Sequence, residues 1–343
     1  MNRGRTRYVV WSAGAVLILF VGCLFLGSVS IPASSVWRIL MGAEEPSSWR
    51  FIVLESRLPQ ALTALFAGAA LAVSGLMLQT VFNNPLAGPS ILGVDSGASL
   101  GVALVMLALG GAVGGSGGVV MSGYLAVVSG AFLGAVAVLG IIILFSMVVR
   151  SNVMLLIIGI MVGYMASSVI SLLNFFAAPD GVYSYTLWGL GDFSGVSLRR
   201  LPLFCGLIAV GLGIAVGLIK PLNALLLGER YAANLGVRVR RVRILMLLCT
   251  GLLTAASTAF CGPVAFIGLA VPHLARLLTG SSDHRLLLPV TVLIGSGIAL
   301  LCNLICLLPG ETGVIPLNAV TPLIGAPVII YVIINQRKIQ YFN

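Results

Sequence analysis

The sequence predicts an all-α membrane protein with about ten transmembrane helices. Hydrophobic residues make up 59% of the 343 residues and charged residues only 8%, whereas a soluble domain carries about 25% charged residues. Mean hydropathy is +1.13. Residues 96–149 carry no formal charge, although one membrane span needs only about 20 apolar residues. Such runs form helices or closed barrels. Apolar and polar residues do not alternate in stretches such as 153–162, so helices are expected.

The spans are predicted in order from the apolar windows. The first follows Arg3, Arg5 and Arg7, which imitate the start of a secretory signal. Its apolar run is longer than a typical signal core, so we expect an uncleaved first helix. Nine windows lie at 8–30, 58–82, 90–110, 120–149, 153–178, 201–219, 244–262, 286–308 and 316–335.

A tenth span is expected at 263–280, although a proline, a histidine and an arginine lower its hydropathy. The basic residues of 238–243 and those at 337–338 should both be cytoplasmic. An even number of crossings must therefore separate them. The apolar windows between them supply three, so the tenth segment must cross as well.

The distribution of charges supports this ten-span topology. It places both termini in the cytoplasm, in a multi-pass protein of the bacterial inner membrane. The inner face receives 14 basic and 3 acidic residues and the outer face 5 basic and 6 acidic ones, giving 14 − 3 = +11 inside and 5 − 6 = −1 outside. The overall charge of +10 therefore does not indicate nucleic-acid binding, because the basic residues flank spans. The inner basic residues are Arg3, Arg5, Arg7, Arg150, Lys220, Arg230, Arg238, Arg240, Arg241, Arg243, Arg276, Arg285, Arg337 and Lys338. The outer ones are Arg38, Arg50, Arg57, Arg199 and Arg200.

The six cysteines lie inside apolar segments and are expected to be small buried side chains rather than a disulfide framework. Cys302 and Cys306 are one helical turn apart, yet no histidine or carboxylate lies nearby to complete a metal site. The cysteines are therefore interpreted as packing residues.

The longest cytoplasmic stretch, at about 220–243, contains too few apolar residues to span a membrane and too many for a solvated loop. A short amphipathic helix packed on another protein would bury them. A helix lying at the lipid headgroups would do so equally. The residues leave both alternatives open.

No energy source is visible in the chain. A phosphate-binding loop needs a lysine followed by serine or threonine, but Lys220 precedes Pro221 and Lys338 precedes Ile339. Coupled carriers keep ionisable residues at mid-membrane, whereas Asp95 is expected to cap a helix at its inner end and His273 to be interfacial. We therefore expect a transport subunit that is not an enzyme, driven by a partner. The rival interpretations are a self-sufficient channel or secondary carrier and, less well supported, a membrane-embedded enzyme.

Several motifs in register resemble the FecCD permease family, the membrane subunits of importers for iron–siderophores, haem and cobalamin. The resemblance covers the chain from about residue 57 to its end. It rests on Arg57-Leu58-Pro59, 68–75, Asn84-Pro85-Leu86-Ala87-Gly88-Pro89, 92–94, Leu227-Gly228-Glu229, Leu235-Gly236-Val237, 262–263, 266–269, 271–276, 283–285 and 324–327.

The resemblance implies one permease domain over 1–343, with the type II fold of ATP-binding-cassette importers. It also implies a second permease copy (a homodimer or a sister chain), separate ATPase subunits that carry ATP and magnesium, and a periplasmic binding protein. The chain itself would hold no cofactor. The residues implied to contact the ATPase are Leu227, Gly228, Glu229, Ala232, Leu235 and Gly236, and those implied at the cytoplasmic gate are Asn84, Leu86, Ser151 and Asn152.

Arg57 is implied to dock the binding protein, but the sequence departs from the family near it. A second arginine usually follows three residues later, where this chain has Gln60, and 302–310 lacks the arginine that many members carry. Docking could instead rest on Arg57 with Arg50, Arg199 or Arg200. The substrate is expected to be an iron–siderophore or haem chelate, with cobalamin as the alternative.

Overall fold

All regular elements in the described part of the computed structural model are helices. The structure describes residues 3–108, 120–149, 151–308 and 313–334. In chain order the elements are α1 (Arg3–Phe25), α2 (Ala33–Leu40), α3 (Ser47–Phe51), η1 (Ile52–Arg57), α4 (Leu58–Val81), η2 (Pro89–Leu92), α5 (Val94–Ala103), η3 (Leu104–Ala108), α6 (Val120–Val148), α7 (Asn152–Phe176), α8 (Pro179–Gly189), α9 (Leu201–Gly217), α10 (Ile219–Leu225), α11 (Glu229–Asn234), α12 (Val239–Cys261), α13 (Ile267–Thr279), α14 (His284–Cys306) and α15 (Leu317–Ile334).

The ten predicted spans each coincide with a helical segment. Six helices are long and apolar enough to cross a membrane, and a seventh is obtained if α9 and α10, which meet at 54°, form one span. The remaining three are the shorter apolar helices Val94–Ala108, Ile267–Thr279 and Leu317–Val332. The tenth segment, which charge parity predicted at 263–280 and hydropathy alone left doubtful, is thus a helix, α13.

Two of the shorter helices are completed by irregular backbone. The 13 residues of α13 rise only about 20 Å, less than a hydrocarbon core of about 30 Å. Residues 262–266 precede α13, and residues 82–93, which are irregular apart from the single 3₁₀ turn of η2, precede α5. Non-helical backbone at membrane depth is tolerated where it is buried in protein or lines a cavity. These two segments are therefore expected either to be buried in the protein or to line a functional cavity inside it.

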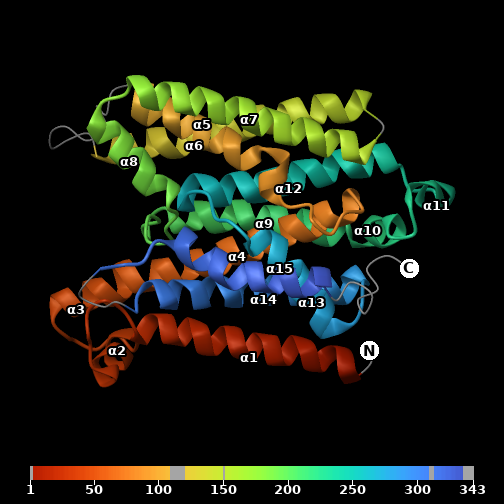
Figure 1. Ribbon diagram of the computed structural model, residues 1–343. Coiled ribbons are helices and arrows are strands. Elements are labelled where there is room, and N and C mark those ends of the chain that lie inside the picture. The colour runs from red at the N-terminus through yellow and green to blue at the C-terminus, as the bar shows by residue number, and fades with distance from the viewer. Residues whose placement is uncertain (1–2, 109–119, 150, 309–312, 335–343) are drawn as a thin grey trace.

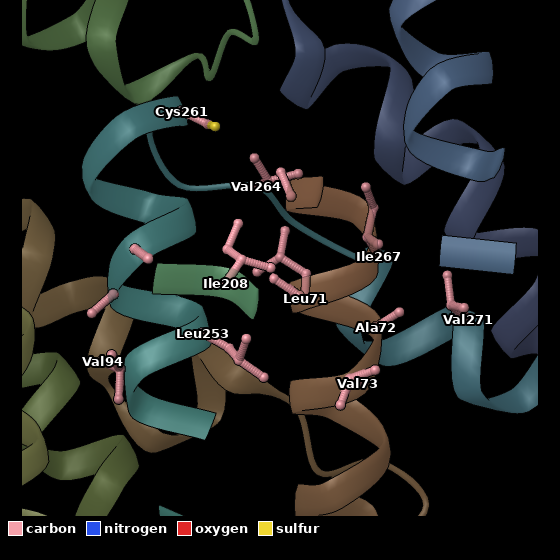
Figure 2. Packing of buried hydrophobic residues seen from close by; sticks show 14 of the residues in the cluster. Leu71, Ala72, Val73, Val94, Ile208, Leu253, Cys261, Val264, Ile267 and Val271 are labelled. Atoms are coloured by element: carbon pink, nitrogen blue, oxygen red, sulfur yellow. The ribbon is translucent and has the colours of Figure 1, made fainter. Parts of the chain in front are cut away.

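The core is organised around α4, most of whose residues are buried. Figure 2 shows Leu71, Ala72 and Val73 of α4 surrounded by apolar side chains of α5, α9, α12 and α13. By contrast α1 lies at the edge of the bundle, where it packs on α14 (Figure 1). Leu17 and Ile18 of α1 are 63% and 72% exposed, as expected for side chains that face lipid.

Helices approach closely where small residues face each other. A Cβ at Gly75 of α4 would overlap the carbonyl oxygen of Gly268 in α13, and one at Gly101 of α5 would overlap that of Gly130 in α6. Because lipid provides no hydrophobic force between helices, such close packing is a main source of stability for a membrane bundle. The glycine content of these spans is thus a packing requirement.

Asp95 is not the helix cap at the inner boundary that the sequence predicted. Gly93 is the N-cap of α5, without a capping side chain. A Cβ at Gly97, in the same turn as Asp95, would meet Gly134 of α6. Gly134 lies 14 residues, about 21 Å, from the end of α6 at Val148. The carboxylate therefore lies near the middle of the membrane, because the chain returns to this depth through 82–93 before α5 begins.

The short elements gather at the two ends of the bundle. The start of α1 lies at the same end as α10 and α11, whereas α2, α3 and α8 lie at the opposite end (Figure 1). A small separate core forms beneath α2 and η1 from Val36, Ile39 and Val53, each at most 3% exposed. The two ends thus carry different surfaces on one membrane-embedded body.

Candidate functional site

The α10–α11 segment, residues 219–237, contains two short helices. A glycine turn separates them, and a second glycine turn follows α11. Gly228 adopts φ +96° and ψ 153° before α11, and Gly236 adopts φ +83° after it. Residues other than glycine rarely adopt such backbone angles. A Cβ at either position would meet no atom within 4 Å. Both glycines are therefore required by backbone conformation and not by lack of space.

An apolar row projects from the α10–α11 segment away from the bundle. Leu227, Tyr231 and Leu235 follow one another at a spacing of four residues and are 61%, 60% and 60% exposed. Ala232 points the opposite way and is fully buried, so it holds α11 on the bundle instead of facing a partner. The row is the surface that the sequence predicted would be covered by a partner or by lipid headgroups.

Glu229, the first residue of α11, connects this segment to the predicted gate. Its Oε1 accepts a hydrogen bond from Arg243 Nη2 at 2.5 Å and from Asn152 Nδ2 at 3.1 Å. Asn152 Nδ2 also donates to the carbonyl oxygen of Val81 at 3.1 Å. Val81 is the last residue of α4, so four helices meet at this point. One predicted ATPase-contact residue and one predicted gate residue are thereby in direct contact.

Asn223 fastens α10 to the core from the other side. Its Nδ2 donates to Asp283 Oδ1 at 2.8 Å, and its Oδ1 accepts from the backbone N–H of His284 at 2.8 Å. The same oxygen lies 2.8 Å from His284 Nδ1, which places the imidazole proton on Nδ1. His284 Nε2 lies 3.0 Å from the hydroxyl of Thr80 in α4. Movement of α10 therefore acts on the inner ends of α14 and α4 together.

The gate turn, residues 82–87, follows α4 directly. Asn84 Oδ1 accepts from the backbone N–H of Leu86 at 2.9 Å, which closes the turn, and Leu86 is 43% exposed. His273 of α13 donates its Nε2–H to the carbonyl oxygen of Pro85 at 2.8 Å. His273 is only 1% exposed, so its ring is enclosed by the protein. It is a buried residue that positions the gate turn.

A buried polar pair supports the same turn. Gln79, in the last turns of α4, accepts from Arg276 Nη1 at 2.5 Å and donates to the carbonyl oxygen of Leu269 at 3.2 Å. Arg276 is 4% exposed. Because both partners of Gln79 belong to α13, the end of α4 and α13 are linked as one unit beneath the gate turn.

Ser151 lies at the start of α7, where its Oγ accepts from the backbone N–H of Met154 at 3.4 Å and caps the helix. The residue is exposed beside Asn152. Of the four predicted gate residues, Asn84 and Leu86 belong to the turn, whereas Ser151 and Asn152 lie on the facing end of α7. Val81, through its bond to Asn152, joins the two parts.

Arg57 is enclosed in the protein, and the geometry gives no support to a docking role for it. It is 4% exposed and donates to the carbonyl oxygens of Leu24 and Phe25, each at 3.0 Å, and to that of Val29. These are carbonyls at and beyond the end of α1, which have no partner within that helix. The guanidinium therefore acts as a cap for α1.

Gln60, which replaces the family's second arginine, is also turned inward. Its Nε2 donates to Asn303 Oδ1 at 2.9 Å, and Asn303 Nδ2 donates to Cys23 Sγ at 3.7 Å. Asn303 belongs to the run that lacks the other family arginine. Gln60 and Asn303 therefore form one neutral hydrogen-bonded pair between α4 and α14.

Other basic residues remain on the surface. Arg50 and Arg199 are exposed, and the guanidinium carbon of Arg200 lies 3.8 Å from the ring centre of Tyr124. Five of the six cysteines are buried, as predicted. Arg150, Glu311, Arg337 and Lys338, and the side chains of Arg3 and Arg5, lie outside the described residues.

Sequence reasoning missed the residues that connect the segments. Tyr231 and Asn223 lay inside the stretch that it singled out, and the spacing of four between Leu227, Tyr231 and Leu235 was a readable signal. Arg243 was counted only as one charge of a basic cluster. Its contact with Glu229 spans 14 residues and depends on how α11 folds back on α12, which no local pattern shows.

Comparisons with known proteins agree with this geometry. The model of the FecCD transport family matches residues 15–335. The vitamin B12 import system permease protein BtuC of Yersinia enterocolitica is 34% identical over 340 residues, covering 95% of this chain and 93% of that protein. Its counterpart in Klebsiella pneumoniae is 33% identical, covering 95% and 94%. A solved structure of a metal-chelate type ABC transporter in an inward-facing conformation has a TM-score of 0.83 and 29% identity, covering 96% of this chain and 99% of that one.

Proposed function

This chain belongs to the FecCD transport family and is the membrane permease subunit of an ATP-binding-cassette importer for a chelate, and we propose that a separate ATPase drives it through the α10–α11 segment. The observation that carries the proposal is the exposed row Leu227, Tyr231 and Leu235 on a segment whose Glu229 contacts gate residue Asn152. Exposed apolar side chains of this kind fit a groove on a partner protein.

The coupling step follows from the contacts of Glu229. A push or pull on α11 moves Glu229, and with it the Asn152 amide that bonds to Val81 at the end of α4. Asn152 Oδ1 is buried and accepts no hydrogen bond from the described residues. A buried acceptor without a donor costs about 1–3 kcal/mol. An arrangement of the gate that gives this oxygen a donor would recover that cost.

The proposed assembly contains two ATPase subunits, a second permease copy and a periplasmic binding protein in the bacterial inner membrane. The end of the bundle that carries α10, α11 and the start of α1 would face the cytoplasm, in line with the charge distribution of the sequence. ATP and magnesium would be bound by the ATPases and no cofactor by this chain. For docking of the binding protein we propose the exposed Arg50 and Arg199 in place of Arg57.

The proposed cargo is a large metal chelate, namely an iron–siderophore or haem. Cobalamin is the alternative, and the names of the relatives from Yersinia enterocolitica and Klebsiella pneumoniae favour it. The described part of the chain offers no cluster of three or more metal-ligating side chains. We propose that the metal travels as part of the cargo, inside its chelator.

Mass spectrometry of what copurifies with the tagged protein from its native host tests the ATPase interface. We expect a stoichiometric ATPase with the wild-type chain and its loss with Leu235→Asp, which places a charge in the apolar row. Met41→Asp is the matched control, because Met41 is 66% exposed beside α2 at the opposite end of the bundle. Absence of an ATPase from intact, monodisperse wild-type protein would instead favour a stand-alone carrier.

A further inference from the structure

A cavity of about 430 Å³ has Asp95 and several serines in its lining. Its lining comes from α5, α7, α8, α15 and the irregular segment at 263–265 and includes Ser96, Ser99, Ser167 and Tyr185. A second cavity of about 160 Å³ shares Asp95 and continues along residues 264–266 towards α4. The two irregular segments that complete α5 and α13 thus do line a cavity.

Asp95 is the only charged residue on the walls of either cavity within the described chain. Its Oδ1 accepts from the hydroxyl of Thr258 at 2.7 Å, and no ion pair joins it to an arginine, lysine or histidine of the described residues. Ionisable side chains at mid-membrane are costly and typically belong to a transport pathway. A carboxylate in this position gives the cavity a preference for positive charge and for hydrogen-bond donors.

The remaining wall adds hydroxyl groups without any positive charge. Ser99 interacts with the side chain of Tyr185, and a phenol is neutral at physiological pH. Asn318 is already committed: its Nδ2 donates to the carbonyl oxygens of Gly189 at 3.0 Å and Pro263 at 2.6 Å, and its Oδ1 accepts from the Ala265 N–H at 3.1 Å. The amide therefore fixes the shape of the wall and does not offer donors to an anion.

The cavity opens on the exposed side of α7. Ser167 at its mouth is exposed, and Tyr164 and Leu172 on the same helix are 65% and 59% exposed. A volume near 430 Å³ falls in the range of small-molecule pockets, so it suits one substituent of a bulky chelate better than a bare ion.

We infer that the Asp95 cavity is a specificity pocket that receives an ammonium- or amide-bearing arm of the cargo and disfavours chelates with an anionic periphery. The inference rests on the proposed importer function and narrows its cargo. Haem, with two carboxylates, and catecholate chelates would be repelled by Asp95. Amide-rich corrinoids and hydroxamate chelates with a free ammonium group would be accepted.

Charged thiol reagents test the cavity in the purified permease alone. We would introduce Ser99→Cys in a Cys205→Ser background, since the other five native cysteines are buried. A trimethylammonium methanethiosulfonate should react with it at least about tenfold faster than a sulfonate methanethiosulfonate, given the strength of charge interactions at low effective dielectric. Asp95→Asn should abolish this ratio and Asp95→Glu should retain it. A Ser28→Cys control, exposed at the far end of α1, should give a ratio independent of Asp95.

Protection experiments connect the cavity to the cargo. A ferric hydroxamate with a free ammonium group, at millimolar concentration, should slow labelling of Ser99→Cys at least about threefold, and the same chelate succinylated to an anion should not. Equal labelling rates for the two reagents, equal protection by the two chelates, or protection by neither would overturn the inference. Failure of the proposed function is separable, because it would appear as loss of the copurifying ATPase with the labelling ratio unchanged.

Discussion

Replacing Gly228 with alanine should uncouple the permease without harming its insertion. Gly228 has φ +96° and ψ 153°, a region that only glycine adopts readily, and no atom lies within 4 Å of the place that a Cβ would occupy. The effect of alanine is therefore backbone strain and not a clash. Strain of this kind costs about 1–3 kcal/mol. The turn lies outside the helices of the bundle, so the chain can relieve the strain by rotating α11.

The expected loss of function follows from that magnitude. If the native turn must form for the ATPase to engage α11, a strain of about 1–3 kcal/mol lowers its population and the uptake rate by about 5–150-fold. The assay is ATP-driven uptake by the complex reconstituted in liposomes, normalised to the amount of inserted permease. Bulkier residues at position 228 should act like alanine or more strongly.

A matched glycine separates strain from the general effect of adding a methyl group. Gly213 lies inside α9, with no atom within 4 Å of a Cβ and without a positive φ. Gly213→Ala should leave uptake unchanged or raise stability slightly, because alanine favours helix over glycine by about 0.5–1 kcal/mol. Uptake by Gly228→Ala within twofold of wild type would refute the assignment of this turn to the ATPase interface.

Three further changes test the network around this segment. Glu229→Gln removes the carboxylate from Arg243, whose side chain is only 10% exposed. We expect the contact between α11 and α12 to weaken by about 1–2 kcal/mol and uptake to become roughly tenfold slower with the ATPase still bound. Uptake at the wild-type rate would contradict this role. Arg57→Gln should lower the free energy of unfolding by about 2–4 kcal/mol, because the carbonyls at the end of α1 lose their donor. A loss of affinity for the binding protein with unchanged stability would instead argue for a docking role. Gly75→Ala should reduce the yield of folded protein, because its Cβ overlaps the Gly268 carbonyl; a yield equal to that of Gly213→Ala would show that α4 and α13 can separate.

The two predicted functional regions prove to be one connected unit. The gate turn is held by His273 from α13, and its first anchor, Val81, is held by Asn152. Asn152 in turn bonds to Glu229 of α11. Motion at the ATPase contact can therefore reach the gate through three hydrogen-bonded groups, without any change in the packed core of α4.

The sequence alone determined the all-α membrane class, the ten apolar segments that coincide with helices and the position of the α10–α11 segment. Hydropathy and charge asymmetry carry this information because lipid demands apolar helices and cytoplasmic loops retain basic residues. Even α13, whose composition hides it, followed from charge parity. The resemblance to a family then located Gly228 and Gly236, and the structure supplies the reason in their positive φ angles.

Only the tertiary structure decided how deep each residue lies and what it contacts. Asp95 stands at the start of α5, which a sequence reader places at the membrane boundary, but residues 82–93 carry that start to mid-membrane. Arg57 looks like a surface arginine until the end of α1 folds over it. Hydropathy measures transfer to lipid, residue by residue. Depth and burial instead arise from contacts between segments such as α1 and η1 or α5 and α6, which lie apart in the chain and meet only when the helices pack.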